Sequence, residues 1–226
     1  METRSPRART SFPLKTLLFL PVPLLFLTVS VSQLRVTMQA YDLLYAARLI
    51  DSGKPVSIDY IDTLLDTMKA DDIPCRHDVV TAVMTTRFHT LDRLNAAATN
   101  PEKWQKALDQ AGQFVRRGLA CFPTDGGLWL RLAVVRWAGD APAADVAMAM
   151  TQSQQSSPVE TAPLLGRIEM WNRMSRAAIQ AAEPAARADI TTYDAYFRAI
   201  KPKALLTPSP ALADLMASVG VAPSKD

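Results

Sequence analysis

Residues with reactive side chains are most concentrated in the stretch Cys75-Arg76-His77-Asp78. A cysteine nucleophile needs a base within hydrogen-bond reach and a further group that orients the base. Cys75 and His77 are too close in sequence for their side chains to face each other on a helix. We therefore expect no catalytic residues, and a thiol enzyme that uses Cys75 and His77 stands as an alternative.

Metal and nucleotide sites are not expected either. Zinc needs three or four convergent ligands, and the chain has only two cysteines and two histidines. Cys75 and His89 should lie about three helical turns apart. The chain has 8 glycines and lacks the GxGxxG and GxxxxGKS/T motifs that bring backbone close to phosphates. The sequence therefore predicts no metal, no cofactor and no small-molecule substrate.

The two cysteines, Cys75 and Cys121, are expected to form a disulfide. Cys75 precedes one expected helix and Cys121 follows the next, so an antiparallel hairpin of these helices brings both to the same end. Disulfides are typical of oxidising compartments. Closing a loop of this length stabilises a fold by about 4 kcal/mol in the chain-entropy model. Buried, reduced cysteines are the alternative.

Three residues on one expected helix are candidates for binding a partner, namely Arg131, Arg136 and Trp137. Arginine and tryptophan are enriched at the energetic centres of protein interfaces. The alternatives are a solvated face or intramolecular ion pairs for the arginines, and a core position for Trp137. Just before these residues, Asp125-Gly126-Gly127 is either an anion-binding nest or a turn that begins a helix.

The charge of the chain is concentrated at its N-terminus. The 226 residues include 25 Lys+Arg and 22 Asp+Glu, a formal net charge of +3. Residues 1–32 contain four basic residues and one acidic residue, so the remainder has no net charge. Because binding nucleic acid requires a basic face, no nucleic-acid partner is expected. With 49% hydrophobic and 21% charged residues, the chain should fold.

Residues 16–34 are uncharged and are expected to form a transmembrane anchor. As a helix they would span roughly 28 Å, close to the hydrocarbon thickness of a bilayer. Basic residues precede them, so the positive-inside rule predicts a cytoplasmic tail at 1–15 and a periplasmic body. We therefore expect a single-pass protein of a bacterial inner membrane. A signal peptide cleaved after Ser32, in the sequence Ser30-Val31-Ser32, is the alternative.

The body shows helical spacing and helix caps but no strand alternation, which predicts an all-α fold. We expect a helical domain at 35–201 and a flexible C-terminal tail at 202–226, with a short helix after Ser209-Pro210. A capping box at Ser157–Glu160 should begin one of the helices. The expected helices cover 33–51, 58–69 and 76–98 and then begin near Pro101, Asp125, Pro142, Ser157 and Pro184.

Part of the body has the spacing of a helical repeat. Pro123 and Pro158 lie 35 residues apart at helix boundaries, and Trp129, Leu132 and Ala133 follow the first proline. These residues resemble the tetratricopeptide pattern of an aromatic, a leucine and a small residue on the first helix of each unit. The resemblance covers about 104–171 and is clearest at 124–158. It implies antiparallel helical hairpins stacked as an α-solenoid; an ordinary helical bundle is the alternative.

Solenoids of this kind present extended binding surfaces. We therefore expect a membrane-anchored periplasmic interaction or scaffold module whose partners are proteins of a bacterial envelope complex. The resemblance implies a role in envelope assembly, such as exopolysaccharide synthesis and export or cytochrome maturation. The alternatives are a structural subunit of an inner-membrane complex and a cell-envelope thiol or cell-wall enzyme that uses Cys75 and His77.

Overall fold

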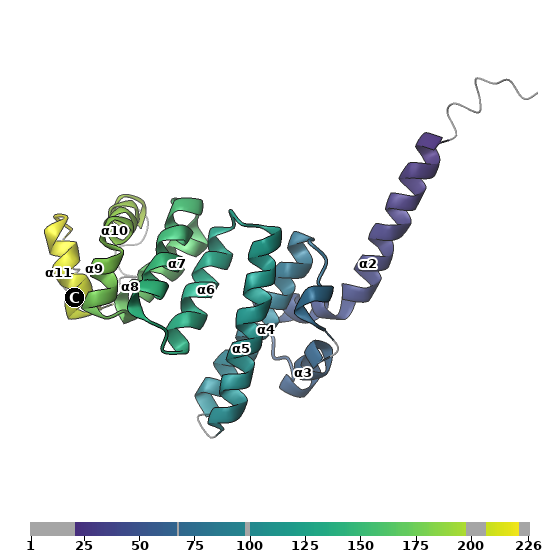
Figure 1. Ribbon diagram of the computed structural model, residues 1–226, viewed down its shortest axis with the longest axis horizontal. Coiled ribbons are helices and arrows are strands. Elements are labelled where there is room, and N and C mark those ends of the chain that lie inside the picture. Colours follow the sequence, from purple (N-terminus) through teal and green to yellow (C-terminus); the bar gives the residue numbers. More distant parts are fainter. Residues whose placement is uncertain (1–20, 67, 98–99, 198–206, 222–226) are drawn as a thin grey trace, which may run out of the picture. The chain divides into compact units, whose positions relative to one another are not determined.

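The computed structural model describes residues 21–66, 68–97, 100–197 and 207–221, and within these ranges all regular structure is helical (Figure 1). The predicted all-α fold is therefore confirmed. The expected cytoplasmic tail at 1–15 and residues 16–20 of the expected anchor lie outside the described residues. The helices are α2 (Pro21–Asp51), α3 (Ile58–Asp66), the 3-10 helix η1 (Ala70–Asp72), α4 (His77–Ala97), α5 (Pro101–Cys121), α6 (Gly126–Ala138), α7 (Ala143–Ser156), α8 (Thr161–Arg173), α9 (Arg176–Ala181), α10 (Glu183–Phe197) and α11 (Pro210–Ser218).

The first helix, α2, continues without interruption well past the expected anchor. Pro21 and Pro23 lie in its first turn, where a missing backbone N–H has no cost. Every side chain from 21 to 35 is exposed, although most of these residues are apolar. By its length and composition this helix can cross a membrane. The chain divides into two compact units, and the second begins at Leu43 rather than at the expected residue 35.

In the second unit, helices that are consecutive in sequence pack against each other. Helices α4, α5, α6 and α7 lie side by side in that order, and α7 also contacts α9 and α10 (Figure 1). Their apolar faces form the core, and the largest fully buried apolar side chains are Trp171, Ile61, Leu65, Met84, Met150, Leu164, Val79, Val80, Val83 and Val115.

Several helix boundaries are set by the local caps that the sequence predicts. The Asn100 carboxamide accepts a hydrogen bond from the Lys103 backbone N–H (2.9 Å) at the start of α5. The Asp125 carboxylate accepts one from Leu128 (3.0 Å) at the start of α6. These bonds satisfy backbone donors that an α-helix leaves unpaired in its first turn.

The expected capping box at Ser157–Glu160 is wrong. Helix α8 begins at Thr161, and Glu160 caps it without a side-chain hydrogen bond. Ser157 instead ends α7 and is buried, and its carbonyl accepts a hydrogen bond from Arg167 (3.1 Å). Ser157 is therefore buried beside Arg167, a residue distant in sequence, and does not cap α8. The expected helix near Pro184 is present as α10, which begins at Glu183, and the short α9 before it was not expected.

The expected flexible tail at 202–226 requires a correction. Residues 202–206 and 222–226 lie outside the described residues, but Pro210–Ser218 form α11, which packs against α8, α9 and α10. Its first turn is capped by the Ser209 hydroxyl, as the sequence predicts. Leu212, Leu215 and Met216 are buried, so this segment belongs to the folded unit.

A buried ion pair ties three helices together. Arg167 on α8 and Asp189 on α10 are both fully buried, and Arg167 donates from Nε to both Asp189 oxygens (3.0 and 2.9 Å). Trp171 Nε1 donates to the same carboxylate (2.8 Å). The Arg167 guanidinium also donates to the carbonyls of Ser153 (3.3 Å) and Ser157 (3.1 Å) on α7 and at its end. The network is therefore well satisfied on both sides.

The network extends to the start of α6 through a close approach of backbone. The Ser153 hydroxyl donates to the Gly126 carbonyl (2.7 Å). A Cβ at Gly126 would lie 2.4 Å from Ser157 Oγ and 2.8 Å from the Ser153 carbonyl oxygen. Only glycine fits here, because those two atoms occupy the space of a side chain.

Burial raises the pKa of the Asp189 carboxyl above its ordinary value, and the hydrogen bonds from Arg167 and Trp171 act in the opposite direction. The attraction between the two charges therefore mainly offsets the free energy that it costs to bury them, and the pair adds little net stability. Removing one partner, however, leaves the other charge buried and unpaired.

Replacing Arg167 should consequently destabilise the fold strongly. We expect Arg167→Met to lower the free energy of unfolding by about 3–5 kcal/mol, because the Asp189 carboxylate loses its counter-charge. Chemical denaturation of the full-length chain in detergent micelles measures this. The control, Glu183→Gln, removes an exposed pair with Arg187 and should cost less than about 0.5 kcal/mol. Equal effects of both variants would contradict the assigned role.

A methyl group at position 126 should also be poorly tolerated. We expect Gly126→Ala to lower the free energy of unfolding by about 1–3 kcal/mol, because backbone must move to admit the Cβ. Gly127→Ala is the matched control: its Cβ would meet only side-chain atoms of Asp125 and Arg131, at 3.1 and 3.4 Å. It should change stability by less than about 1 kcal/mol. Thermal unfolding that ranks the two variants in the reverse order would refute the explanation.

Candidate functional site

The structure brings the two cysteines together. The sulfur atoms of Cys75 and Cys121 lie 2.01 Å apart, at disulfide-bonding distance, and their Cα atoms are 5.3 Å apart. Cys75 precedes α4 and Cys121 ends α5, so the pair closes one end of the hairpin that these helices form. This is the arrangement that the sequence predicts.

The His77 side chain contacts Asp125 and Phe122. Its Nε2 lies 3.3 Å from the Asp125 carboxylate, and its ring packs edge-on against Phe122 at 5.5 Å between centroids. Because Cys75 is joined to Cys121, the described residues contain no cysteine thiolate for His77 to activate. Within those residues no group of three Cys, His, Asp or Glu side chains is placed to hold a metal ion.

The stretch Asp125-Gly126-Gly127 serves as the turn that begins α6. The Asp125 carboxylate itself occupies the helix N-terminus, where it accepts the hydrogen bond from Leu128. Ser157 fills the space beside Gly126. An external anion therefore has no room in this arrangement, and the nest alternative is not supported.

The three candidate partner residues do not form one site. Arg131 is half-buried; burial lowers its pKa, and the nearby carboxylates Asp125 and Asp51 act in the opposite direction. Arg136 donates to the Asp145 carbonyl (2.9 Å) and lines a hollow of about 340 Å³. Trp137 is 39% exposed and lines a different hollow. Of the three, only Trp137 lies at an apolar recess.

That recess, the Trp137 groove, has a volume of about 370 Å³. Its apolar lining comes from α4, α5 and α6, and the polar residues that line it are exposed. The apolar lining comprises Phe88, Leu91, Trp104, Leu108, Val134, Val135, Trp137 and Ala138, and the polar lining comprises Asp92, Asp140 and Arg173.

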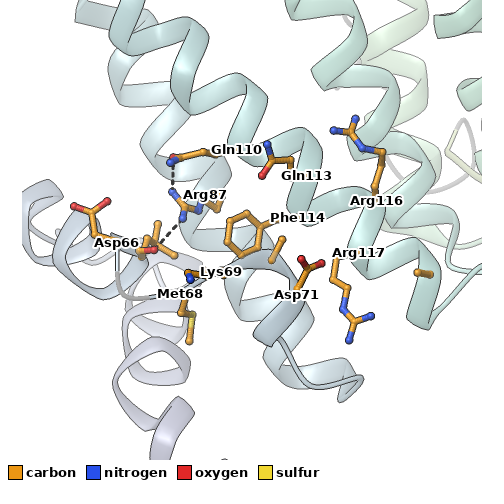
Figure 2. A pocket seen from close by; sticks show the side chains of 13 residues that line it. Asp66, Met68, Lys69, Asp71, Arg87, Gln110, Gln113, Phe114, Arg116 and Arg117 are labelled. Atoms are coloured by element: carbon orange, nitrogen blue, oxygen red, sulfur yellow. Dashed lines mark hydrogen bonds between the residues drawn. The ribbon is translucent and has the colours of Figure 1, made fainter.

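A second hollow, which we call the arginine cavity, has a volume of about 800 Å³, and Figure 2 shows the side chains that line it. Helix α5 supplies one side of it, and the segment from the end of α3 to η1 supplies the other. Its lining residues are Leu65, Asp66, Met68, Lys69, Ala70, Asp71, Arg87, Gln110, Gln113, Phe114, Arg116, Arg117 and Ala120.

Arg87, on α4, is the most deeply buried polar residue of this cavity. Its guanidinium donates to the Gln110 carboxamide (3.0 Å) and to the Leu65 carbonyl (3.1 Å), and it lies 4.5 Å from the centroid of the Phe114 ring. Its Nε is buried without a hydrogen-bond partner. Burial lowers the pKa of Arg87, and the carboxylates of Asp66 and Asp62 raise it. Arg87 is thus a buried cation that is only partly compensated.

Arg117 also has an unpartnered buried Nε, and it donates from its terminal nitrogen to the Ile73 carbonyl (3.2 Å). Lys69 and Arg116 are exposed at the same cavity. The lining therefore contains four cationic side chains but only two carboxylates, those of Asp66 and Asp71. It carries a local excess of positive charge within a body whose residues balance overall.

The sequence analysis missed Arg87 and Lys69. A signal for Arg87 exists, because it lies four residues after Val83 and four before Leu91, both buried on α4. A charged residue on the apolar stripe of a helix must be buried with partners. Lys69 gives no such signal, since its place depends on how α3 and η1 turn.

Comparison of the chain with family models, curated proteins and solved structures gives no match. The class that the fold defines is therefore an all-α protein with one helix long and apolar enough to cross a membrane.

The cysteine pairing can be measured directly. Full-length protein denatured without reductant should show no reactive thiol, and reduction should expose both cysteines. Reduction should also lower the free energy of unfolding by about 4 kcal/mol in the chain-entropy model. The double variant Cys75→Ser, Cys121→Ser is the control and should not respond to reductant. Two reactive thiols per chain before reduction would contradict the pairing.

Proposed function

We propose that this protein is a membrane-anchored interaction module of a bacterial cell envelope, with its body in the periplasm and the Trp137 groove as its binding surface. The observation that carries the proposal is the groove itself. A tryptophan that is 39% exposed borders an apolar recess large enough for two or three bulky side chains. Exposed aromatic side chains beside such recesses are typical anchors of protein interfaces.

The anchor part of the proposal is supported by α2 and by the charges before it. The side chains of residues 21–35 are exposed and mostly apolar, which suits contact with lipid. Arg4, Arg7, Arg9 and Lys15 precede this segment, and the positive-inside rule then directs the body away from the cytoplasm. The continuity of the helix through Ser32 favours an uncleaved anchor over a cleaved signal peptide.

The charges at the groove favour a partner that carries a basic residue. Asp92 and Asp140 line the groove together with its apolar residues, and among the described residues neither forms an ion pair. Arg173 is already paired with Glu169 on its own helix. We therefore propose an envelope protein that inserts apolar side chains from one segment and carries a basic residue beside them. Such charges at the rim chiefly set specificity and the rate of association.

The other expectations bear on this proposal in different ways. The pairing of Cys75 with Cys121 disfavours a thiol enzyme, because Cys75 then has no free thiol that could act as a nucleophile. The sequential packing of α4 to α7 fits both the tetratricopeptide-like resemblance and an ordinary helical bundle. Envelope assembly, such as exopolysaccharide export or cytochrome maturation, stays a hypothesis that rests on that resemblance.

Site-specific photocrosslinking in intact cells tests this function. A photoreactive amino acid in place of Trp137 should give one defined protein adduct, and the same group in place of Leu165 should not. Leu165 is the control because its exposed fraction, 41%, is similar to the 39% of Trp137, while Leu165 does not line the groove. Protease added to spheroplasts should digest the body of the adduct if it lies in the periplasm.

The captured protein must then bind at the groove. We expect Trp137→Ala to weaken binding of that purified partner by about tenfold or more, as at an interface anchor. Asp92→Lys should slow association by charge repulsion, and Leu165→Ala should leave affinity unchanged. An adduct whose binding is insensitive to Trp137→Ala would refute the groove as the binding surface.

A further inference from the structure

We infer that the arginine cavity binds a polyhydroxylated anion, specifically a carboxylated sugar of two or three rings. This site is separate from the Trp137 groove and does not depend on the proposed function. The sequence predicts no small-molecule substrate, and the inference concerns a ligand that is bound and not converted.

The first argument is charge. Lys69, Arg87, Arg116 and Arg117 line the cavity. Arg87 is only 7% exposed, and no carboxylate among the described residues forms an ion pair with it. A cation taken out of water without a direct counter-charge is unfavourable. An anionic group in the cavity would supply the missing negative charge.

The second argument is the state of the guanidinium donors. The Nε atoms of Arg87 and Arg117 are both buried without hydrogen-bond partners. Buried donors are nearly always satisfied in folded proteins. Both arginines line the arginine cavity, so the two unpaired donors belong to neighbouring residues of one site. A bound anion would compensate the charge of both guanidinium groups, whether or not it touches Nε.

The third argument selects the kind of anion. Figure 2 shows Gln110, Gln113 and Arg116 along α5, with Asp66, Lys69 and Asp71 on the facing segment. The two carboxylates would repel a simple anion such as phosphate. They would, however, accept hydrogen bonds from hydroxyl groups, and the glutamines can both donate and accept. Only a ligand with hydroxyl and anionic groups together matches this mixed lining.

The size of the cavity sets the length of the ligand. A volume of about 800 Å³ lies in the range of pockets that hold molecules larger than a single sugar. Several lining residues, such as Lys69 and Arg116, are exposed to solvent, so a longer chain could extend out of the cavity. Guanidinium groups bind carboxylates in a two-point geometry, so the uronic acids are the sugars that the arginines suit.

Calorimetric titration of the full-length chain in detergent micelles tests the inference, with trigalacturonate as the probe. We expect measurable binding that weakens as salt is added and that is about tenfold or more tighter than binding of neutral maltotriose. Lys69→Gln combined with Arg116→Gln should weaken trigalacturonate binding by about tenfold or more, since each removes a charge-assisted contact. Both side chains are exposed, so the variant should fold.

Two further variants make the result decisive. Arg176→Gln, which removes an exposed charge on α9, far from the helices that line the cavity, should leave affinity within about twofold, as distant exposed charges are screened. Asp71→Ala should weaken trigalacturonate binding through loss of a hydroxyl acceptor. If Asp71→Ala tightens binding, or inorganic phosphate binds more tightly than trigalacturonate, the site takes a simple anion and the inference is wrong. Absence of binding, or equal binding of maltotriose, would overturn it as well.

The outcome is independent of the partner experiment. Trp137→Ala should leave trigalacturonate affinity unchanged, because Trp137 does not line the arginine cavity. Loss of sugar binding in this variant would mean that the sugar occupies the Trp137 groove, which also contradicts the inference.

Discussion

The buried charge of Arg167 is the constraint on which the second half of the body depends. An arginine without water must find acceptors for its whole guanidinium group, and no single helix can provide them. Here the Asp189 carboxylate comes from α10 and the carbonyls of Ser153 and Ser157 come from α7 and its end. The Ser153 hydroxyl carries the connection to the Gly126 carbonyl at the start of α6. The relative placement of α6, α7, α8 and α10 is therefore specified by polar geometry as well as by apolar packing, and alternative packings would leave a charge unpaired.

In the first half of the body, close helix packing and the cysteine pair fix the position of α5, which lies between the two hollows. Gly118 allows α5 to approach both neighbours: a Cβ there would lie 3.1 Å from Val80 on α4 and 3.2 Å from Leu128 on α6. The Cys75–Cys121 pair joins the end of α5 to a residue two positions before the start of α4. Close backbone approach restricts sideways movement, and the covalent link restricts sliding. Both hollows are therefore bordered by a helix whose position is well determined.

How much of this can be predicted from sequence depends on the range of each interaction. The starts of α5, α6 and α11 follow from Asn100, Asp125 and Ser209, because each cap bonds a backbone N–H three residues later. The cysteine pair follows from hairpin topology alone. The predicted capping box at Ser157 is wrong, and the Ser157 carbonyl instead accepts a hydrogen bond from Arg167, ten residues away. The arginine cavity is invisible to local patterns, since it joins residues of α3, η1, α4 and α5 that no periodicity relates. A charged residue on the apolar stripe of a helix indicates that its side chain is buried, but the sequence does not identify the residues that form hydrogen bonds with it.

The two hollows lie on opposite sides of α5. Gln110, Gln113 and Arg117 line the arginine cavity, while Trp104 and Leu108 line the Trp137 groove. With 3.6 residues per turn, these two sets are about half a turn apart around the helix axis. The two linings share no residue, but α4 and α5 contribute to both: Arg87 on α4 lines the arginine cavity, and Phe88 and Leu91 on α4 line the Trp137 groove. A ligand in one hollow can therefore influence the other by moving α4 or α5. Since α5 is packed closely through Gly118 and linked covalently at Cys121, such movement is opposed. By linkage, each ligand then changes the affinity for the other little or not at all. If the proposed partner and the proposed sugar both bind, this arrangement lets them bind at the same time without either one controlling the other.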